Sequence, residues 1–242
     1  MRELKSTYDT WHAAIASASE SDRIQPWHEN ALAFIPDLNH LEVLEVGCGR
    51  GDFAIFLSRK FLQSKITAVD FSDSAVATAL SRSTDAPRPP VFQVEDAQSM
   101  SFASASFDFV LSCECMEHVP DPSRMAKEIA RVLKPGGRFV ITTENYANGL
   151  LLAWIVAWLR RQPFDSGTGV QPHENFFLFW RVRRLLERAG LQVETMTSSH
   201  FQWLLLPRVA PDKLRTDRFR TPLLNRAFRP FGRHFTFVGS RV

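Results

Sequence analysis

Short apolar runs alternate with amphipathic stretches along the first part of this 242-residue chain. Five apolar runs predict strands, which lie near residues 41–46, 65–70, 90–94, 107–112 and 137–143. The amphipathic stretches between them predict helices. One of these is expected to begin at Asp121-Pro122, because proline is favoured in a first helical turn, and to end before Pro135-Gly136. Strands that alternate with helices over short connections favour a parallel sheet.

The pattern changes after the fifth predicted strand. Residues 150–159 are uninterruptedly apolar and are followed by Arg160-Arg161. A membrane span needs about twenty such residues, so this run cannot cross a bilayer. Two interpretations stay open: a buried lid over an apolar substrate, and a segment that dips into a lipid interface. A helix is predicted over 181–189. Strands are predicted to begin at residue 191 and to span 235–239, whereas residues 200–232 give no clear pattern.

Before the core, residues 1–37 predict two helices, whose Tyr8, Trp11 and Trp27 are candidates to cap a ligand pocket. We therefore divide the chain into four segments. They are a helical N-terminal cap (1–37), a core (38–146), an apolar lid or insertion (147–180) and a C-terminal helix with closing strands and a basic variable segment (181–242).

Composition narrows the classes of function. With 45% hydrophobic residues the chain can bury the core of one α/β domain. Its three cysteines are too few for a disulfide framework and its first residues lack an apolar signal core, so we expect a reduced cytoplasmic protein. A net charge of +3 does not indicate nucleic-acid binding. Residues 207–242, however, carry nine Lys or Arg against two Asp, which fits a solvated face or contact with an anionic substrate or lipid surface.

The first predicted strand runs into a glycine turn, Glu45-x-Gly47-x-Gly49-x-Gly51, and a helix is predicted over 52–60. Glycine permits a sharp turn and close approach of a ligand, and the unpaired N–H groups of a helix start face the same place. The dinucleotide fingerprint G-x-G-x-x-G needs glycine where Asp52 stands. Acidic groups at this turn would repel a pyrophosphate but suit a phosphate-free sulfonium ligand with an ammonium group. The turn therefore favours S-adenosylmethionine over NAD.

Five motifs occur in the order found in the class I S-adenosylmethionine-dependent methyltransferases. They are Glu45 to Gly51, Ala68 to Ser72, Glu95 to Ala97, Phe107 to Val110 and Leu133 to Phe139. On these motifs residues 41–145 resemble that class, especially its small-molecule enzymes. The resemblance implies an α/β fold with a Rossmann-like, doubly wound sheet of seven mostly parallel strands and an antiparallel last strand. It also implies a helical N-terminal extension and a helical lid insertion after strand five.

The resemblance assigns the cofactor contacts. Asp70 lies nineteen positions after Gly51, close to the spacing at which an acidic residue reaches ribose hydroxyls. Asp96 and the Ala97 N–H are expected to meet the adenine edge; alternatively, Asp70 and Asp96 only begin turns. The full set of predicted cofactor-binding residues is Glu45, Gly47, Cys48, Gly49, Gly51, Asp70, Phe71, Asp96, Ala97 and Cys113.

The fourth strand is followed by candidate catalytic residues. Glu114, Glu117 and His118, before Val-Pro-Asp-Pro, resemble the Glu-x-x-Glu-His pattern of the demethylubiquinol-type O-methyltransferases of quinone biosynthesis. In one helical turn the three side chains would share a face, where they could hold a divalent cation such as magnesium that lowers the pKa of an acceptor hydroxyl. Two alternatives stay open. In one, His118 acts as the general base; in the other, Glu114 lies near the cofactor, Glu117 faces solvent and His118 is a residue of the pocket wall without a catalytic role.

Further candidates lie later in the chain. His173, with Glu174, could close over the acceptor as a second base, or simply enter a helix; Glu144, Asn145 and Tyr146 follow strand five. With Glu117 and His118, His173 completes the predicted catalytic set. We expect an O-methyltransferase of a small, apolar or lipid-like acceptor, for example quinone-like, with no nucleic-acid partner and with peripheral membrane contact left open. Alternatives are C- or N-methylation, a nicotinamide oxidoreductase and a non-catalytic binding protein.

Overall fold

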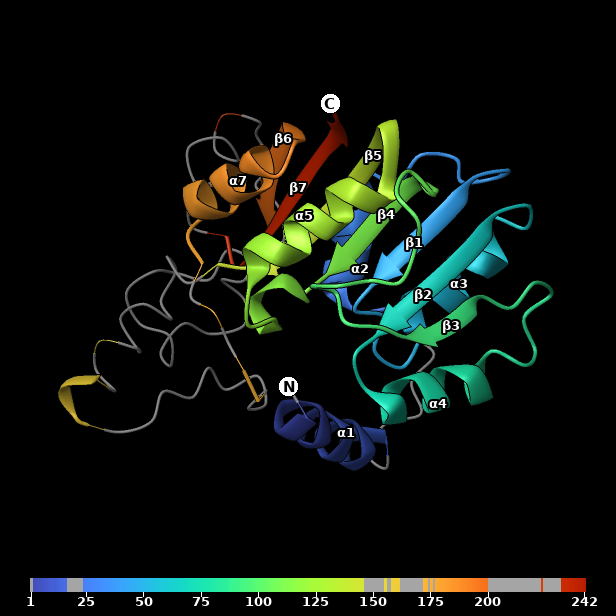
Figure 1. Ribbon diagram of the computed structural model, residues 1–242, viewed down its shortest axis with the longest axis horizontal. Helices are drawn as coiled ribbons and strands as arrows, with labels where there is room; N and C mark the ends of the chain where they lie inside the picture. Colours follow the sequence, from blue (N-terminus) through green and yellow to red (C-terminus); the bar gives the residue numbers. More distant parts are fainter. Residues whose placement is uncertain are drawn as a thin grey trace.

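The computed structural model describes most of the chain. The described residues are 2–16, 24–145, 155, 158–161, 172–173, 175, 177–199, 223 and 232–242. They form one seven-stranded sheet of order β3-β2-β1-β4-β5-β7-β6 (Figure 1). Its strands are β1 (Glu42–Val46), β2 (Lys65–Asp70), β3 (Val91–Val94), β4 (Phe107–Cys113), β5 (Leu133–Glu144), β6 (Leu191–Ser199) and β7 (His234–Arg241).

The pairing of the strands confirms the predicted fold class. Strands β1 to β5 are parallel, whereas β7 lies antiparallel between β5 and β6. The strand order reverses between β1 and β4, so the chain leaves these two neighbours in opposite directions across the sheet. In a doubly wound sheet, the crevice at the carboxyl ends of such strands is where ligands bind.

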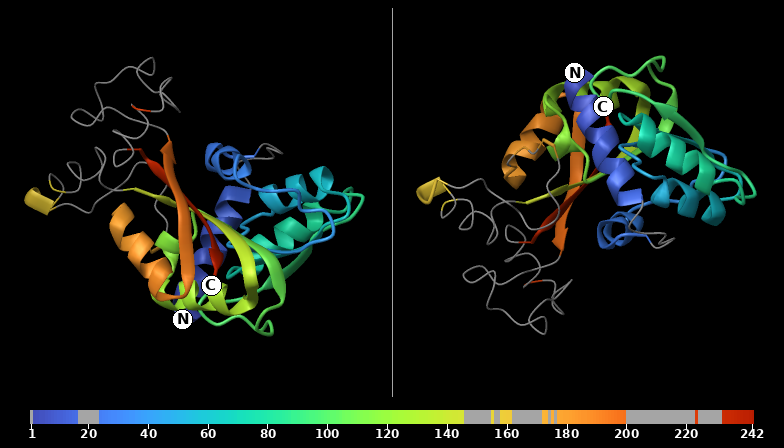
Figure 2. Two further views of the ribbon diagram at one scale, coloured as in Figure 1. Left: turned by 90° about the horizontal axis from the view of Figure 1, so that it is seen from above. Right: turned by 90° about the horizontal axis from the view of Figure 1, so that it is seen from below.

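Helices cover both faces of this sheet (Figure 1). The helices of the described residues are α1 (Arg2–Ala16), which lies at the edge of the sheet, α2 (Pro26–Leu32), α3 (Asp52–Lys60), α4 (Asp73–Arg82), the short 3₁₀ helix η1 (Met116–His118), α5 (Pro122–Val132) and α7 (Phe179–Arg188). The predicted helix over 52–60 and the two helices expected before the core are confirmed. Viewed from below, α1 crosses the carboxyl edge of the sheet beside α4 (Figure 2).

Alternation along the central strands divides the core into two clusters. Leu44 and Val46 of β1 pack with α5 and α7, whereas Val43 packs on the opposite face with α3 and α4. Successive side chains of a strand point to opposite faces, and both faces of this strand are covered. This explains why the central strands read as continuous apolar runs rather than as alternating ones.

Two predicted boundaries at α5 and β5 can be compared with the structure. Asp121 caps α5 as expected, since its Oδ1 accepts from the N–H groups of Ser123 and Arg124 at 3.0 and 3.1 Å. β5, however, begins at Leu133 rather than near 137. Leu133 already pairs with Phe107, and the predicted turn at Gly136, with φ +74°, is an irregularity within the strand. An irregularity of this kind uses the same glycines as a turn, so the local pattern places the start of the strand too late.

The predicted lid and the basic segment fall largely outside the described residues. Of residues 147–180, Ile155, Trp158 and Leu159 are helical and exposed. Of residues 200–231, only Leu223 is described. Among the described residues, no helix is long and apolar enough to cross a membrane. The boundaries of the four segments stay predictions.

Candidate functional site

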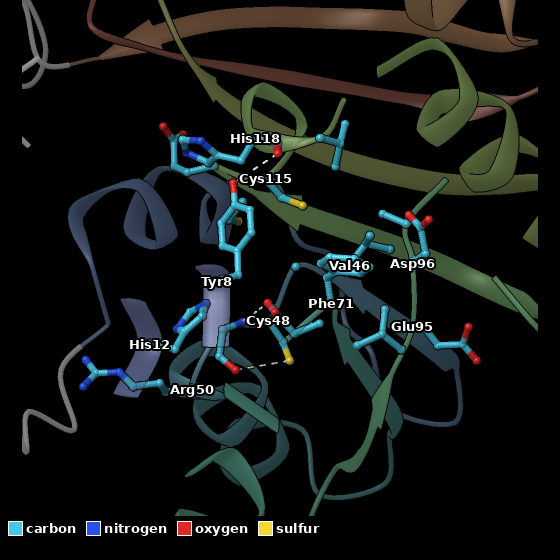
Figure 3. Close-up of a pocket in the computed structure, with 18 of the residues that line it drawn as sticks. Tyr8, His12, Val46, Cys48, Arg50, Phe71, Glu95, Asp96, Cys115 and His118 are labelled. Atoms are coloured by element: carbon cyan, nitrogen blue, oxygen red, sulfur yellow. Dashed lines mark hydrogen bonds between the residues drawn. The ribbon is translucent and has the colours of Figure 1, made fainter. Parts of the chain in front are cut away.

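A cavity of about 360 Å³ opens at the carboxyl ends of β1, β2 and β4 (Figure 3). Its walls come from the turns after β1 to β4 and from residues of α1 and α2 that lie over them. Of the ten predicted cofactor-binding residues, all except Glu45 and Gly51 line it. The predicted cofactor-binding residues therefore lie at the point where the strand order reverses, between β1 and β4.

The glycine turn is held against the neighbouring strand. The N–H groups of Gly47 and Cys48 both donate to the carbonyl oxygen of Val69, at 2.8 and 2.9 Å. Gly47 has φ +78°, and a Cβ there would lie 2.5 Å from the Cβ of Cys115. Gly51, with φ +81°, serves packing instead, because a Cβ would meet Phe92 at 2.8 Å. Glycine is required at both positions, but only Gly47 borders the cavity.

Asp70 stands at the end of β2 and lines the cavity. Its Oδ2 accepts from the Gly49 N–H at 2.8 Å and its Oδ1 from the Ser72 N–H at 3.0 Å. The carboxylate is therefore fixed by main-chain groups on both sides. A carboxylate oxygen has two lone-pair sites, so each oxygen keeps acceptor capacity for a ligand.

Asp96 lines the cavity together with Ala97. Its Oδ1 accepts from both the N–H and the side-chain amide of Gln98, at 2.9 and 3.0 Å. The turn-forming role considered for Asp96 is thus present. It does not exclude ligand contact, because the second carboxylate oxygen makes neither of these bonds.

Glu45 lies beneath the glycine turn rather than on the cavity wall. Its side chain is buried, and its Oε2 has no hydrogen-bond partner among the described residues. Burial, reinforced by the negative charges of Asp52 and Asp70, raises the pKa of Glu45 to about 8. Asp52 itself pairs with Arg82 at 2.6 Å.

The part of the cavity wall that follows β4 is formed by Glu114, Cys115 and His118. The predicted helical turn through Glu114, Glu117 and His118 is not what forms: η1 holds only the last two, and Glu114 precedes it with φ +49°. Glu117 is fully buried behind the wall. Its Oε2 accepts from the Thr143 hydroxyl at 2.9 Å, and its Oε1 from the Glu144 N–H at 3.3 Å.

The carboxyl groups of Glu114 and Glu117 both have a raised pKa. Burial raises the pKa of Glu114 to about 8, with a further contribution from the charge of Glu144. Burial likewise raises the pKa of Glu117 to about 8, with a further contribution from the charge of Glu114. At neutral pH such carboxyls keep protons, unless a nearby cation compensates their charge.

The orientation of His118 is set by its main-chain partner. Its Nδ1 lies 2.9 Å from the carbonyl oxygen of His173. A carbonyl oxygen only accepts, so Nδ1 carries a proton, and in the neutral ring Nε2 is then the acceptor. Nε2 lies 3.9 Å from Glu117 Oε1. The His173 imidazole is not part of the cavity wall; its Nε2 lies 3.2 Å from the amide nitrogen of Asn175.

His234 was missed from the sequence. Its Nδ1 lies 3.0 Å from Glu114 Oε2, although the residues are 120 positions apart. Glu144 lies close to Glu114 and His234 and forms an ion pair with Arg233 at 2.9 Å. Among the described residues, Glu114, Glu144 and His234 form the group whose potential metal-ligand atoms lie within 4.8 Å of one another. No local spacing signals this group, because β7 brings His234 to it.

Helices α1 and α2 close the cavity from outside. Tyr8, Trp11 and Trp27 line it, as predicted. The Tyr8 hydroxyl donates to the carbonyl oxygen of His118 at 3.2 Å, so α1 directly contacts the part of the wall that follows β4 (Figure 3). Burial raises the pKa of the Tyr8 hydroxyl well above its usual range, which keeps it protonated as a donor.

Comparison with known proteins identifies the family. Residues 44–141 match the family model described as a methyltransferase domain. The ubiquinone biosynthesis O-methyltransferase of Coxiella burnetii is 34% identical over 165 residues, which span 66% of this chain and 67% of that one. The chloroplastic tocopherol O-methyltransferase of Arabidopsis thaliana is 36% identical over 114 residues, which span 44% of this chain and 31% of that one.

A solved structure agrees on the fold. An S-adenosylmethionine-dependent methyltransferase from Thermotoga maritima superposes with a TM-score of 0.68 and 17% identity, covering 99% of this chain and 100% of that one. The chain therefore belongs to the class I S-adenosylmethionine-dependent methyltransferases. It is an enzyme whose cofactor is S-adenosylmethionine, and the nicotinamide and non-catalytic alternatives are set aside.

Proposed function

We propose that this methyltransferase transfers the methyl group of S-adenosylmethionine to a hydroxyl oxygen of a small, apolar, quinone-like acceptor. The observation that carries the proposal is the fixed orientation of His118 on the cavity wall, with Nδ1 held by the His173 carbonyl at 2.9 Å. Transfer to oxygen requires a base, and this tautomer leaves Nε2 as an acceptor. The names of the quinone and tocopherol relatives support the same acceptor class.

The cofactor is proposed to lie along the turns that follow β1, β2 and β3. Asp70 would accept from the ribose hydroxyls, and Phe71 would cover the adenine, with Asp96 and the Ala97 N–H at its edge. The methionine part would follow the turn between Gly47 and Gly49. The support is that these residues, which are separated in sequence, line a single cavity.

The proposed reaction is a direct displacement. His118 Nε2 removes the proton from the acceptor hydroxyl as the oxygen attacks the methyl carbon. The carbon–sulfur bond breaks, and S-adenosylhomocysteine leaves while the proton stays on the imidazole. Glu117 Oε1 lies 3.9 Å from Nε2. In its ionised form this carboxylate would stabilise the imidazolium, and the positive charge that develops on the ring favours that form. His173 would act through its carbonyl, which fixes the ring.

A divalent cation such as magnesium is a second proposed component. The residues present fit one in a specific respect: Glu114 Oε1 is buried with no hydrogen-bond partner among the described residues. Glu114 would be the principal ligand, with Glu117 and His118 as the sequence-based partners or Glu144 and His234 as the spatial ones. When bound, the cation would lower the pKa of the acceptor hydroxyl.

EDTA treatment tests the cation. If a cation takes part, chelation abolishes transfer and added magnesium restores it, while Glu114→Gln no longer responds to magnesium. Full activity in EDTA, together with full activity of Glu114→Gln, would contradict this component and leave the base mechanism in place.

Peripheral lipid contact is proposed as the route by which an apolar acceptor reaches the enzyme. Trp158 and Leu159 are each 67% exposed and directly precede Arg160-Arg161. Exposed aromatic and aliphatic groups beside basic ones suit an anionic lipid surface. Sedimentation with phosphatidylglycerol vesicles should fall in Trp158→Ser, whereas Trp180→Ser, a 51% exposed control on α7, should bind as before. Equal binding by both variants would contradict the contact.

The acceptor itself can be found by a direct experiment. The purified enzyme is incubated with cofactor carrying an isotopic methyl label and with a cell extract, and mass spectrometry identifies the metabolite that gains the label. The expected product is a methyl ether of a phenolic, apolar compound. A labelled amine or a new carbon–methyl bond would overturn O-methylation in favour of the N- or C-methylation alternative.

A further inference from the structure

Helix α1 forms part of the outer wall of the cavity. Its cavity-lining residues, Leu4, Tyr8, Trp11 and His12, follow the i, i+4, i+7, i+8 spacing of one helix face. The opposite face, which includes Ser6 and Thr10, is exposed. The helix lies outside the sheet and its two layers, beside α4 (Figure 2). Its position therefore depends on a small set of contacts.

Asp9 makes two of these contacts. Its Oδ1 accepts from the Ser72 hydroxyl at 2.6 Å and from the Ser74 N–H at 3.3 Å. Ser72 is fully buried and caps α4, where its hydroxyl oxygen accepts from the Ala75 N–H at 3.2 Å. A short bond from a hydroxyl to a carboxylate belongs to the strong, charge-assisted class. The neighbouring ion pair of Lys5 with Asp73 is largely exposed and contributes less.

Ser72 links Asp9 to the carboxylate assigned to the ribose. While its hydroxyl donates to Asp9, its main-chain N–H donates to Asp70 Oδ1 at 3.0 Å. Asp70 in turn receives the Gly49 N–H at 2.8 Å. One buried residue thus connects the outer helix with the group that would hold the sugar.

Tyr8, the residue beside Asp9, attaches α1 to the other half of the cavity. It is 9% exposed and donates to the His118 carbonyl oxygen at 3.2 Å. Two adjacent residues of one helix therefore contact the part of the cavity proposed for the cofactor, through Ser72, and the part proposed for the acceptor, through His118. A shift of α1 would change both sides together.

We propose that Asp9 is a positioning residue for the cofactor: its bond to Ser72 latches α1 over the cavity and orients Asp70 for the ribose hydroxyls. The latch rests on the cofactor placement proposed above, but it does not depend on which acceptor is methylated. It predicts that α1 closes over bound cofactor and slows its release.

Calorimetric titration of the full chain with S-adenosylhomocysteine tests the latch. Asp9→Ala should weaken binding about tenfold, because it removes a hydrogen bond to a charged group. Asp9→Asn should recover most of the affinity, since its amide oxygen still accepts from the Ser72 hydroxyl. Thr10→Ala, a control on the exposed face of α1, should bind like the parent protein. Affinity of Asp9→Ala within about twofold of the parent would overturn the latch.

A double-mutant cycle separates coupling from general loss of structure. Ser72→Ala removes the hydroxyl partner of Asp9, so adding Asp9→Ala to it should cost little further in affinity, since only the 3.3 Å bond from the Ser74 N–H is then lost. Additive effects would overturn the connection through Ser72. Hydrogen exchange over residues 2–16 gives a second readout: S-adenosylhomocysteine should slow exchange in the parent but not in Asp9→Ala. Equal slowing in both proteins would overturn closure.

Asp70→Ala distinguishes this inference from the placement on which it rests. If Asp70→Ala binds S-adenosylhomocysteine as tightly as the parent, the proposed cofactor placement is wrong and the latch fails with it. If Asp70→Ala loses binding while Asp9→Ala keeps it, only the latch is wrong.

Discussion

The carboxylate of Asp70 accepts a hydrogen bond from the main-chain N–H of Gly49 at 2.8 Å, across the gap between the ends of β2 and β1. This bond closes the glycine turn against the neighbouring strand. The same carboxylate borders the cavity, so the group that would hold the ribose also shapes the turn that would hold the methionine part.

Asp70→Asn is expected to weaken S-adenosylhomocysteine binding by about tenfold or more. Asparagine keeps one acceptor oxygen, while its amide group would face an N–H donor of Gly49 or Ser72, and an unmatched donor pair costs about 1–3 kcal/mol. Calorimetric titration measures the change. Asp85→Asn, on an exposed loop, is the control and should bind normally. Unchanged binding by Asp70→Asn would leave only its turn-forming role.

Gly47→Ala should cost more stability than Gly136→Ala. The two glycines have φ of +78° and +74°, so both substitutions pay the left-handed penalty of roughly 1–2 kcal/mol. Only at Gly47 does the new Cβ collide with Cys115, whereas nothing lies within 4 Å at Gly136. Urea unfolding should show the difference, and cofactor binding should be lost only in Gly47→Ala. Equal costs would mean that Cys115 moves aside freely.

His118→Gln should reduce methyl transfer by about 10²–10⁴-fold, the usual contribution of a general base. His173→Ala should reduce it far less, because the main-chain carbonyl that holds His118 Nδ1 remains in place. The rate of methyl transfer by each variant is measured with the acceptor found by isotope labelling. The affinity of each variant for S-adenosylhomocysteine shows whether its cofactor site is intact. A larger loss in His173→Ala than in His118→Gln would make the His173 side chain the base.

The buried Glu45 should make stability fall as pH rises from about 5 to about 8. Its folded pKa is raised to about 8, whereas an unfolded Glu titrates near 4.3. Across this window the folded protein binds the extra proton, so its stability is full below the unfolded pKa and declines through the folded one. Denaturant unfolding at several pH values should show a shallower decline in Glu45→Gln. The same slope in both proteins would contradict a protonated Glu45.

Much of the cofactor side was accessible from the sequence. The glycine turn, Asp70 and Asp96 each follow a strand whose apolar run was visible, and parallel strands present their carboxyl ends at one edge of a sheet. Local spacing therefore sufficed to collect them in one cavity. The sequence pattern places the start of β5 near 137 rather than at Leu133, because the glycines of a bulge resemble those of a turn.

The sequence alone determined the class of fold, the family and the residues at the strand ends, because periodicity and turn chemistry are local properties. Only the tertiary structure decided that Ser72 joins Asp9 to Asp70, that Tyr8 reaches the His118 carbonyl and that His234 meets Glu114. These contacts depend on where α1 docks and on the insertion of β7 between β5 and β6. Such placements arise from packing between segments far apart in the chain, which no local pattern of residues encodes.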